Sequence, residues 1–341
     1  MRITFLAPHI KIAGGIRAIL TYADLLAKRN HEVTVIVPIA NFFKRLVGNF
    51  FKNKPRWFKN FAAQIRWVPD YSEKFIPNGD VVVATAWQTA EPVASYGPAK
   101  GRKFYLIQHY ESLYHGVPEK ADKSYRLPLH KIVISSWLKN IMKEKFGAES
   151  DLIVTPVDFK LFHYAEGIRR EDPVRILLLD HSAKWKGTAE GAEAFNLVRK
   201  EFPDIKLILF GVRRRITGIS HDEYFYNPKQ ENLAKIYSSC HVYLCPSEYE
   251  GLGMPSMEAM ACGCALVTYD NGGSRDYAMD GKTAFVARHG SFDDLVNKLK
   301  MAVGNAALRE EIANNGYEFI KTNFSWEKAV EKMENIFSKN A

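Results

Sequence analysis

The chain has 341 residues, of which 47% are hydrophobic and 25% charged, and its formal net charge at pH 7 is +9. This length suggests two domains, and the composition is that of a globular protein with sizeable cores. The sequence contains no apolar run of the ~18 to 20 residues that a membrane-spanning helix needs, and MRITFLAPHI is too short in its apolar part for a secretory signal. We therefore expect a cytoplasmic protein whose positive charge favours anionic partners.

Short strand-like runs alternate with helical periods through the first half of the sequence. RITFLAP (2–8) indicates a first strand, and Gly14 and Gly15 then precede apolar residues at helical spacing. The next strand-like runs are EVTVIVP (32–38), QIRWVP (64–69), DVVVATA (80–86) and KFYLIQ (103–108). Apolar strands separated by helices predict a parallel sheet that is covered on both faces.

The same pattern restarts after a polar stretch at residues 163–173. The strand-like runs of the second half are RILLLD (175–180), KLILFG (206–211), HVYLCPS (241–247) and CALVTYD (264–270). We therefore predict an α/β protein of two Rossmann-like, doubly wound domains, 1–165 and 166–322, and a final helix at 323–341 that packs back on the first domain. Open α/β sheets bind ligands beyond the carboxyl ends of their strands, so we expect the site in loops after strands, facing a central cleft.

Four cysteines lie in the second half, at Cys240, Cys245, Cys262 and Cys264. Their spacings match no common zinc pattern, and most of them fall in strand-like apolar runs. We therefore expect free, buried thiols and no metal site.

The stretch PSEYEGLGMPSMEAMACG (246–263) follows one of the strands and contains two glutamates, Glu250 and Glu258. Pro255 is well placed as the first residue of a helix, whose N-terminal amides attract a phosphate, and the glycines let a ligand approach the backbone. Carboxylates beside such an anion site are suited to accept hydrogen bonds from sugar hydroxyls. The alternative is that Glu258 only complements the helix dipole and Glu250 is solvated. A dinucleotide fingerprint is excluded because Ser256 stands at the position of its third glycine.

SEYEGLGMPSMEAMACG closely resembles the E-x7-E signature of the retaining family 4 glycosyltransferases, with Glu250 and Glu258 at its two glutamates. The resemblance continues in NGGSRDYAMDGKTAFV (271–286) and in TPVDFKLF (155–162), which is similar to the interdomain segment of that family. These stretches cover most of the second half. The first half matches more loosely, through its first strand and its glycine pair.

The resemblance implies a GT-B fold and transfer of a sugar from a nucleotide-diphosphate sugar to a glycan or lipid-linked acceptor, in the synthesis of cell-envelope polysaccharide. Domain 1–165 would bind the acceptor and domain 166–322 the donor. Glu258 would accept hydrogen bonds from the ribose, and Glu250 would contact the donor sugar. The backbone amides near the diphosphate would be those of Gly251, Leu252, Gly253 and Met254. The family retains the anomeric configuration by same-face attack, and the sequence has no D-x-D motif, so we expect neither a metal nor another cofactor.

One motif departs from the family, which has R-x4-K followed by glycine where this sequence reads DHSAKWKG (180–187). Lys186 and Gly187 match, and a cation here would stabilise the diphosphate leaving group. His181, however, replaces the arginine. The candidates for the missing charge are Lys184, Arg213 and Arg214.

Further candidates rest on their position after strands or before helices. His109 follows KFYLIQ, and the resemblance implies that it contacts the donor sugar near the reacting carbon; the alternative is a structural histidine. Gly14 and Gly15 would bring helix amides to the phosphates or the acceptor, or would form a simple loop. Tyr226 would wall in the base or belong to the core, and Asp276 is a lesser candidate for sugar contact.

Residues 41–69 read NFFKRLVGNFFKNKPRWFKNFAAQIRWVP, with seven cations, no acidic residue and many aromatics. Such a segment suits the surface of an anionic membrane, which would make the protein peripheral on the inner face. It suits single-stranded nucleic acid less well, and we expect no nucleic-acid partner. The alternative, a helical insertion with core aromatics and solvated charges, stays open.

Two other functions are compatible with this architecture. A catalytically silent sugar-nucleotide-binding or scaffold protein would keep the fold, and the histidine at position 181 favours it. A nicotinamide-dependent dehydrogenase would need a phosphate fingerprint that neither half contains. The function that we predict is a retaining, metal-independent glycosyltransferase.

Overall fold

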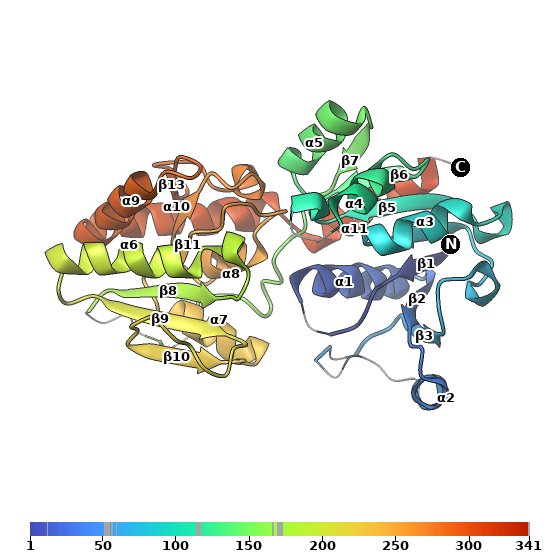
Figure 1. Ribbon diagram of the computed structural model, residues 1–341, viewed down its shortest axis with the longest axis horizontal. Coiled ribbons are helices and arrows are strands. Elements are labelled where there is room, and N and C mark those ends of the chain that lie inside the picture. The colour runs from blue at the N-terminus through green and yellow to red at the C-terminus, as the bar shows by residue number, and fades with distance from the viewer. Residues whose placement is uncertain are drawn as a thin grey trace. The chain divides into compact units, whose positions relative to one another are not determined.

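The computed structural model describes residues 1–11, 13–50, 55, 57–58, 60–113, 117–165, 167–168 and 173–339 (Figure 1). The chain divides into two compact units, Met1–Thr155 with Glu327–Ala341, and Pro156–Trp326. The sequence predicted a domain boundary after residue 165. The structure places it after Thr155, because the segment that follows Thr155 packs on the second unit. Phe162 of this segment is buried and meets Tyr237 at a ring-centroid distance of 6.1 Å.

The described part of the first unit contains a seven-stranded parallel sheet in the order β3-β2-β1-β4-β5-β6-β7 (Figure 1). Its strands are β1 (Arg2–Leu6), β2 (Glu32–Pro38), β3 (Gln64–Val68), β4 (Val81–Ala84), β5 (Arg102–Ile107), β6 (His130–Val133) and β7 (Ser150–Leu152). Its helices are α1 (Gly14–Lys28), α2 (Phe42–Phe50), α3 (Trp87–Ser95), α4 (Pro118–Tyr125) and α5 (Ser136–Phe146), with 3-10 turns η1 (Glu73–Phe75), η2 (Pro98–Lys100) and η3 (Glu111–Leu113).

The central strands of this sheet are apolar on both faces. All the side chains of β4 are buried, as are Ile3 and Phe5 of β1. Continuous apolar runs of this kind form strands that are covered on both faces, whereas a half-exposed strand alternates apolar and polar residues. The predicted parallel sheet is therefore confirmed.

The last helix, α11 (Trp326–Lys339), packs on the first unit. Phe337 meets Phe104 of β5 at a ring-centroid distance of 4.8 Å. The Glu334 carboxylate accepts a hydrogen bond from Arg29 Nε at 2.9 Å and lies 2.8 Å from His31 Nε2. Apolar packing and these polar contacts hold α11 in place.

The described part of the second unit contains a six-stranded parallel sheet in the order β10-β9-β8-β11-β12-β13. Its strands are β8 (Arg175–Asp180), β9 (Lys206–Gly211), β10 (Glu223–Tyr226), β11 (Val242–Cys245), β12 (Ala265–Tyr269) and β13 (Phe285–Ala287). Its helices are α6 (Thr188–Glu201), α7 (Gln230–Ser238), α8 (Met254–Ala261), α9 (Phe292–Gly304) and α10 (Ala306–Asn323), with 3-10 turns η4 (Lys184–Lys186) and η5 (Gly273–Asp276).

The strand order of the second unit reverses between β8 and β11, which are neighbours in the sheet. Loops that leave the carboxyl ends of two such strands run in opposite directions, and ligands of open α/β sheets bind where they part. Leu178 of β8 and Leu244 of β11 belong to the core that Phe195 of α6 and Leu299 of α9 complete. This core fixes the loop after β8 and the loop after β11 at the carboxyl end of the sheet.

The four cysteines are free and buried, as predicted. No helix in the described ranges has the length and apolarity that crossing a bilayer requires.

Candidate functional site

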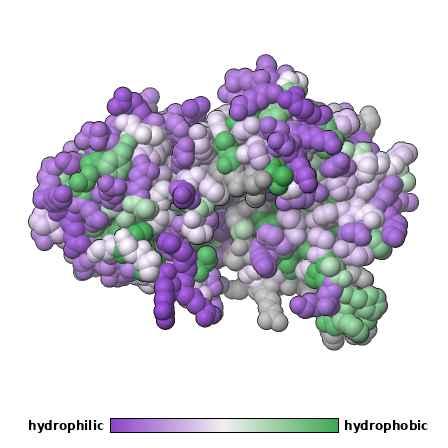
Figure 2. Space-filling model, viewed as in Figure 1, coloured by the Kyte–Doolittle hydropathy of each residue, from purple (hydrophilic) through white to green (hydrophobic). Residues whose placement is uncertain are grey.

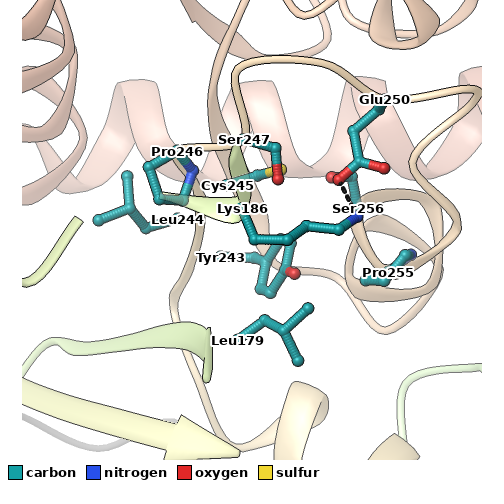
Figure 3. Close-up of a pocket in the computed structure, with 10 residues that line it drawn as sticks. All are labelled: Leu179, Lys186, Tyr243, Leu244, Cys245, Pro246, Ser247, Glu250, Pro255 and Ser256. Carbon is teal, nitrogen blue, oxygen red and sulfur yellow. Dashed lines mark hydrogen bonds and ion pairs between the residues drawn. The ribbon is translucent and has the colours of Figure 1, made fainter. Parts of the chain in front are cut away.

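In the second unit, an ion pair joins the loop after β8 to the loop after β11. The ammonium of Lys186, from η4 after β8, lies 2.6 Å from Glu250 Oε1, in the loop after β11 (Figure 3). Both side chains are largely buried. Burial works against the charge of Lys186, but the Glu250 carboxylate outweighs it and raises the pKa of the ammonium. The structure therefore brings together two residues that the sequence predicted from separate motifs.

The loop 271–273 after β12 fixes the backbone of Glu250. Glu250 N donates to Asn271 O at 3.0 Å, and Gly273 N donates to Glu250 O at 3.1 Å. A side chain at Gly273 could not be accommodated, because a Cβ there would lie 2.6 Å from Leu252 N. This supporting role of Asn271 and Gly273 was not predicted from the sequence. The signal was the pair of glycines after the strand CALVTYD, which permits two backbones to approach closely.

The glycine-rich loop of the E-x7-E stretch leads into α8. Gly251, Leu252 and Glu258 are buried, and Gly253, with φ of 86°, is the N-cap of the helix. The helix begins at Met254, one residue before the Pro255 that the sequence predicted, and Pro255 lies in its first turn, where a residue without an N–H is tolerated. Glu250 is also buried, so the solvated position that the sequence left open for this glutamate is excluded.

A small cavity of about 10 Å³ lies beside the ion pair (Figure 3). Its lining includes Tyr243, Cys245, Ser247 and Ser256 in addition to Lys186 and Glu250. A volume of this size holds at most a single water molecule. A nucleotide would therefore have to contact the pair from outside this cavity.

His181 lies beside the ion pair but offers little positive charge. Burial lowers the pKa of its imidazole, and the Lys186 ammonium lowers it further. Its Nδ1 accepts a hydrogen bond from Ala183 N at 3.0 Å, and its own backbone N donates to Thr188 Oγ1 at 3.0 Å. The imidazole is therefore neutral near pH 7, unlike the arginine that it replaces. Lys184 is in the same turn, η4.

Of the arginines after β9, Arg213 is the one that the structure holds near His181. Its guanidinium donates to both carboxylate oxygens of Asp180, the buried last residue of β8, with Nε 2.9 Å from Oδ2. Tyr224 Oη donates to Arg213 O at 2.5 Å and so fixes the backbone. Arg214 instead donates to Tyr226 Oη at 3.4 Å at the exposed surface. The role of the buried Asp180 in orienting Arg213 was not predicted from the sequence, because no spacing of residues shows that the end of β8 lies beside the loop after β9.

Tyr226 ends one strand of this sheet, and Asp276 follows another. Tyr226, the last residue of β10, is 48% exposed, so the core position that the sequence left open for it is wrong. Asp276 ends η5 and is half-buried. Tyr226 is thus available to a ligand, as a base-binding residue must be.

In the first unit, β5 ends beside the start of α1. Gly14 and Gly15 open this helix, and their N-cap residue, Ala13, provides no side-chain hydrogen bond to it. A Cβ at Gly15 would lie 3.2 Å from Gln108 Oε1, so this glycine permits the loop after β5 to approach the helix. His109, next in that loop, is half-buried, and its carbonyl accepts a hydrogen bond from Tyr125 Oη at 3.2 Å. The roles proposed for these three residues stay predictions.

Glu111 is a carboxylate held in an apolar environment after β5. Its Oε2 accepts hydrogen bonds from Trp87 N at 3.0 Å, at the start of α3, and from Tyr105 Oη at 3.2 Å. Its own backbone N donates to Tyr125 Oη at 2.9 Å. Burial raises the pKa of the Glu111 carboxyl from 4.5 to about 7, although these hydrogen bonds to the carboxylate partly offset the effect.

The raised pKa of Glu111 makes stability depend on pH. The folded state binds the proton more tightly than the unfolded state, so this group's stabilisation is complete below about pH 4.5 and is lost as the pH rises to about 7. The loss amounts to about 3 kcal/mol at most. Glu111→Gln removes this dependence, whereas Glu119→Gln, at an exposed position of α4, should keep it. Urea unfolding gives the free energy of unfolding of the three proteins at about pH 5 and at about pH 8. If Glu111→Gln loses as much stability between these two pH values as the unmodified protein, the assignment to Glu111 is contradicted.

Comparison with known proteins agrees with this geometry. Residues 163–319, which include the ion pair and the E-x7-E stretch, match the family described as Glycosyl transferases group 1. The second unit is therefore similar, over most of its length, to the group 1 glycosyltransferases. The match runs from before β8 to within α10, so the supporting loop at Asn271 and the arginine at position 213 belong to the same domain.

Proteins of polysaccharide synthesis are among the relatives of this chain. The chain is 27% identical over 272 residues to the O-antigen biosynthesis protein RfbC of Myxococcus xanthus, a match that covers 76% of this chain and 20% of that protein. It is 27% identical over 171 residues to the capsular polysaccharide biosynthesis glycosyltransferase CapM of Staphylococcus aureus, covering 46% and 45%. The chain thus spans less than half the length of either relative.

Solved structures establish the fold of the whole chain. Sucrose-phosphate synthase from Thermosynechococcus elongatus superposes with a TM-score of 0.78 at 15% identity and covers 99% of this chain and 98% of its own. HepE from Anabaena, crystallised with UDP-glucose, has a TM-score of 0.76 at 14% identity, covering 99% and 100%. The two Rossmann-like units are therefore those of the GT-B fold, as predicted.

Proposed function

We propose that the protein is a retaining glycosyltransferase that moves a sugar from a nucleotide-diphosphate sugar to a glycan or lipid-linked acceptor during synthesis of a cell-envelope polysaccharide. The observation that carries the proposal is the buried pair of Lys186 and Glu250 within the residues that match the group 1 family. The polysaccharide relatives and the HepE complex with UDP-glucose support the class of reaction and donor. We place the protein in the cytoplasm, on the inner face of the membrane.

In this proposal Lys186 and Glu250 work as one unit at the phosphate side of the donor. The bond between the sugar's anomeric carbon and the diphosphate oxygen breaks while the acceptor oxygen attacks on the same face. The acceptor's proton goes to the leaving diphosphate. Lys186 stabilises the charge that develops on this group, and Glu250 orients Lys186 and accepts a hydrogen bond from the sugar. Glu258 holds the ribose, and the Gly251–Met254 amides face the diphosphate.

Turnover of a panel of nucleotide sugars tests this function. We expect the chain to release one nucleoside diphosphate from its sugar, faster when an acceptor glycan or glycolipid is added and equally well in EDTA. NMR of the product should show the anomeric configuration of the donor. An inverted product would contradict retention, and loss of activity in EDTA would contradict metal independence.

Arg213 is our candidate for the charge that His181 lacks. Asp180 and Tyr224 hold its guanidinium and backbone near His181, and Arg213 is among the charges that act on that imidazole. Arg213→Ala should weaken binding of the nucleoside diphosphate by about 10- to 100-fold, as expected for loss of a charge-assisted hydrogen bond, and leave binding of the nucleoside unchanged. Arg214→Ala, at the adjacent exposed position, is the matched control. Equal effects of the two substitutions in calorimetric titration would exclude this role.

A silent sugar-nucleotide-binding protein remains the second candidate function. The neutral His181 favours it, because the position contributes no charge to a leaving group. Such a protein would bind a nucleotide sugar and release no nucleoside diphosphate, whereas the transferase does both. The turnover panel therefore separates the two functions.

A further inference from the structure

Helix α2 carries a contiguous apolar surface that the protein leaves uncovered. Four of its side chains are largely exposed: Phe42 (59%), Phe43 (75%), Leu46 (56%) and Val47 (48%). Figure 2 shows them as a green cluster at the end of the first unit. The other large exposed hydrophobic residues of the described chain are dispersed over separate elements, including Leu197 of α6 and Met301 of α9. Single exposed apolar residues are ordinary, but a contiguous patch marks a binding surface.

The opposite side of α2 is fixed to the edge strand β3. Asn49 Nδ2 donates to Trp67 O at 2.9 Å, and Trp67 N donates to Asn49 Oδ1 at 2.9 Å. Gly48 is buried against the same residue, since a Cβ there would lie 2.8 Å from Trp67 Cδ1. Successive helical residues are about 100° apart, which places Gly48 opposite the centre of the apolar face. The contacts with Trp67 therefore hold the apolar face outward.

The structure also separates the aromatic residues of the 41–69 segment. Phe61 and Trp67 are buried, and Trp57 Nε1 donates to Ile10 O at 3.1 Å, so these belong to the body of the unit. For Phe61, Trp67 and Trp57, the alternative that the aromatics of this segment are core residues therefore holds. Among the aromatic side chains that the structure describes in this segment, only Phe42 and Phe43 are presented as an exposed patch; residues 51–54, 56 and 59, and the side chain of Phe50, lie outside the described part.

The charged residues of the segment 41–69, which contains α2 and β3, are all cations. Lys44 on α2 and Arg66 on β3 are exposed, and the segment 41–69 as a whole has seven cations and no acidic residue. Two copies of the chain meeting through α2 would place these cations against one another. An anionic lipid surface instead accepts both the apolar side chains and the cations.

We propose that α2 is a membrane-docking helix that inserts Phe42, Phe43, Leu46 and Val47 into the headgroup region of an anionic bilayer, with Lys44 and Arg66 at the phosphates. Docking needs no sugar transfer, so it can be measured whether or not the proposed reaction takes place. In the transferase, docking would hold the first unit at the surface that carries a lipid-linked acceptor.

Vesicle sedimentation tests the docking. At low salt the protein should pellet with vesicles that contain phosphatidylglycerol and stay in solution with pure phosphatidylcholine vesicles, and added salt should release it. The double variant Phe43→Ser/Leu46→Ser should bind at least about ten-fold more weakly, because each large apolar side chain contributes that order of affinity. Lys44→Glu/Arg66→Glu should weaken binding by about ten-fold or more. Leu197→Ser/Met301→Ser, two exposed positions in the second unit, should bind like the unmodified protein.

All the substituted side chains are exposed, so the variants should have the same melting temperature as the unmodified protein. Failure to pellet with anionic vesicles at low salt would overturn the proposal. Undiminished pelleting of Phe43→Ser/Leu46→Ser would overturn it as well. Sedimentation velocity shows whether the protein forms a dimer. If it forms a dimer that Phe43→Ser/Leu46→Ser dissociates, and does not bind vesicles, the patch is an interface with a second copy of the chain and the proposal is overturned.

Discussion

Glu250→Gln and Lys186→Met should each lower the rate of sugar transfer by about 10²- to 10³-fold, the range found when a preorganised group that stabilises transition-state charge is lost. Either substitution leaves the other partner as a largely buried charge without its counter-ion. Each should therefore also destabilise the second unit, by about 3 kcal/mol.

The double variant Glu250→Gln/Lys186→Met separates the two effects. With both charges removed, stability should recover towards that of the unmodified protein, because no unpaired buried charge remains. Transfer should stay as low as in the single variants, since residues that act as a unit show non-additive losses. Glu248→Gln, an exposed glutamate of the same loop, should leave both quantities unchanged. Recovery of transfer in the double variant would show that the pair is structural only.

Gly187→Ala should cause the largest loss of stability among single substitutions at this site. Gly187 has φ of +67° between η4 and α6, and a Cβ there would lie 2.2 Å from Pro246 O, in the loop that leads to Glu250. The side chain would push the two loops of the ion pair apart. We expect destabilisation by more than about 3 kcal/mol, from steric overlap added to the ~1 to 2 kcal/mol of a left-handed non-glycine residue.

Gly281→Ala is the matched control for this prediction. Gly281 has the same φ of +67°, but a Cβ there would meet nothing within 4 Å. Only the backbone cost of ~1 to 2 kcal/mol should appear. The free energy of unfolding from denaturant titration compares the two variants. Equal values would mean that the loops at Gly187 yield without cost, and that the position of Lys186 does not depend on this close approach.

Sequence patterns were sufficient for the sheets and for naming Lys186 and Glu250 as candidates, because these depend on local signals, but not for the contact between the two residues. Apolar runs such as VVVA in β4 form buried strands, and Lys186 and Glu250 each lie in a motif that can be recognised alone. Contacts between motifs could not be predicted in the same way. Asn271 fixes Glu250 and Asp180 orients Arg213 through pairings that only the strand order creates.

Helix α2 shows the same limit of local reasoning. The sequence treated the aromatics of residues 41–69 as one set, since composition does not distinguish a core residue from an exposed one. The contacts of Gly48 and Asn49 with Trp67 decide which face of α2 is exposed. These contacts join residues far apart in the sequence, so no helical period reveals them.

Nucleotide binding tests the central claim most directly. Thermal unfolding would be followed with saturating UDP, GDP, dTDP, ADP or NAD, each without added metal. A ligand at a hundred times its Kd adds about 2.7 kcal/mol, a shift of several degrees. The account predicts a shift with one nucleoside diphosphate, and loss of that shift in Glu258→Ala. A shift with NAD alone, or with none of the five ligands, would contradict it.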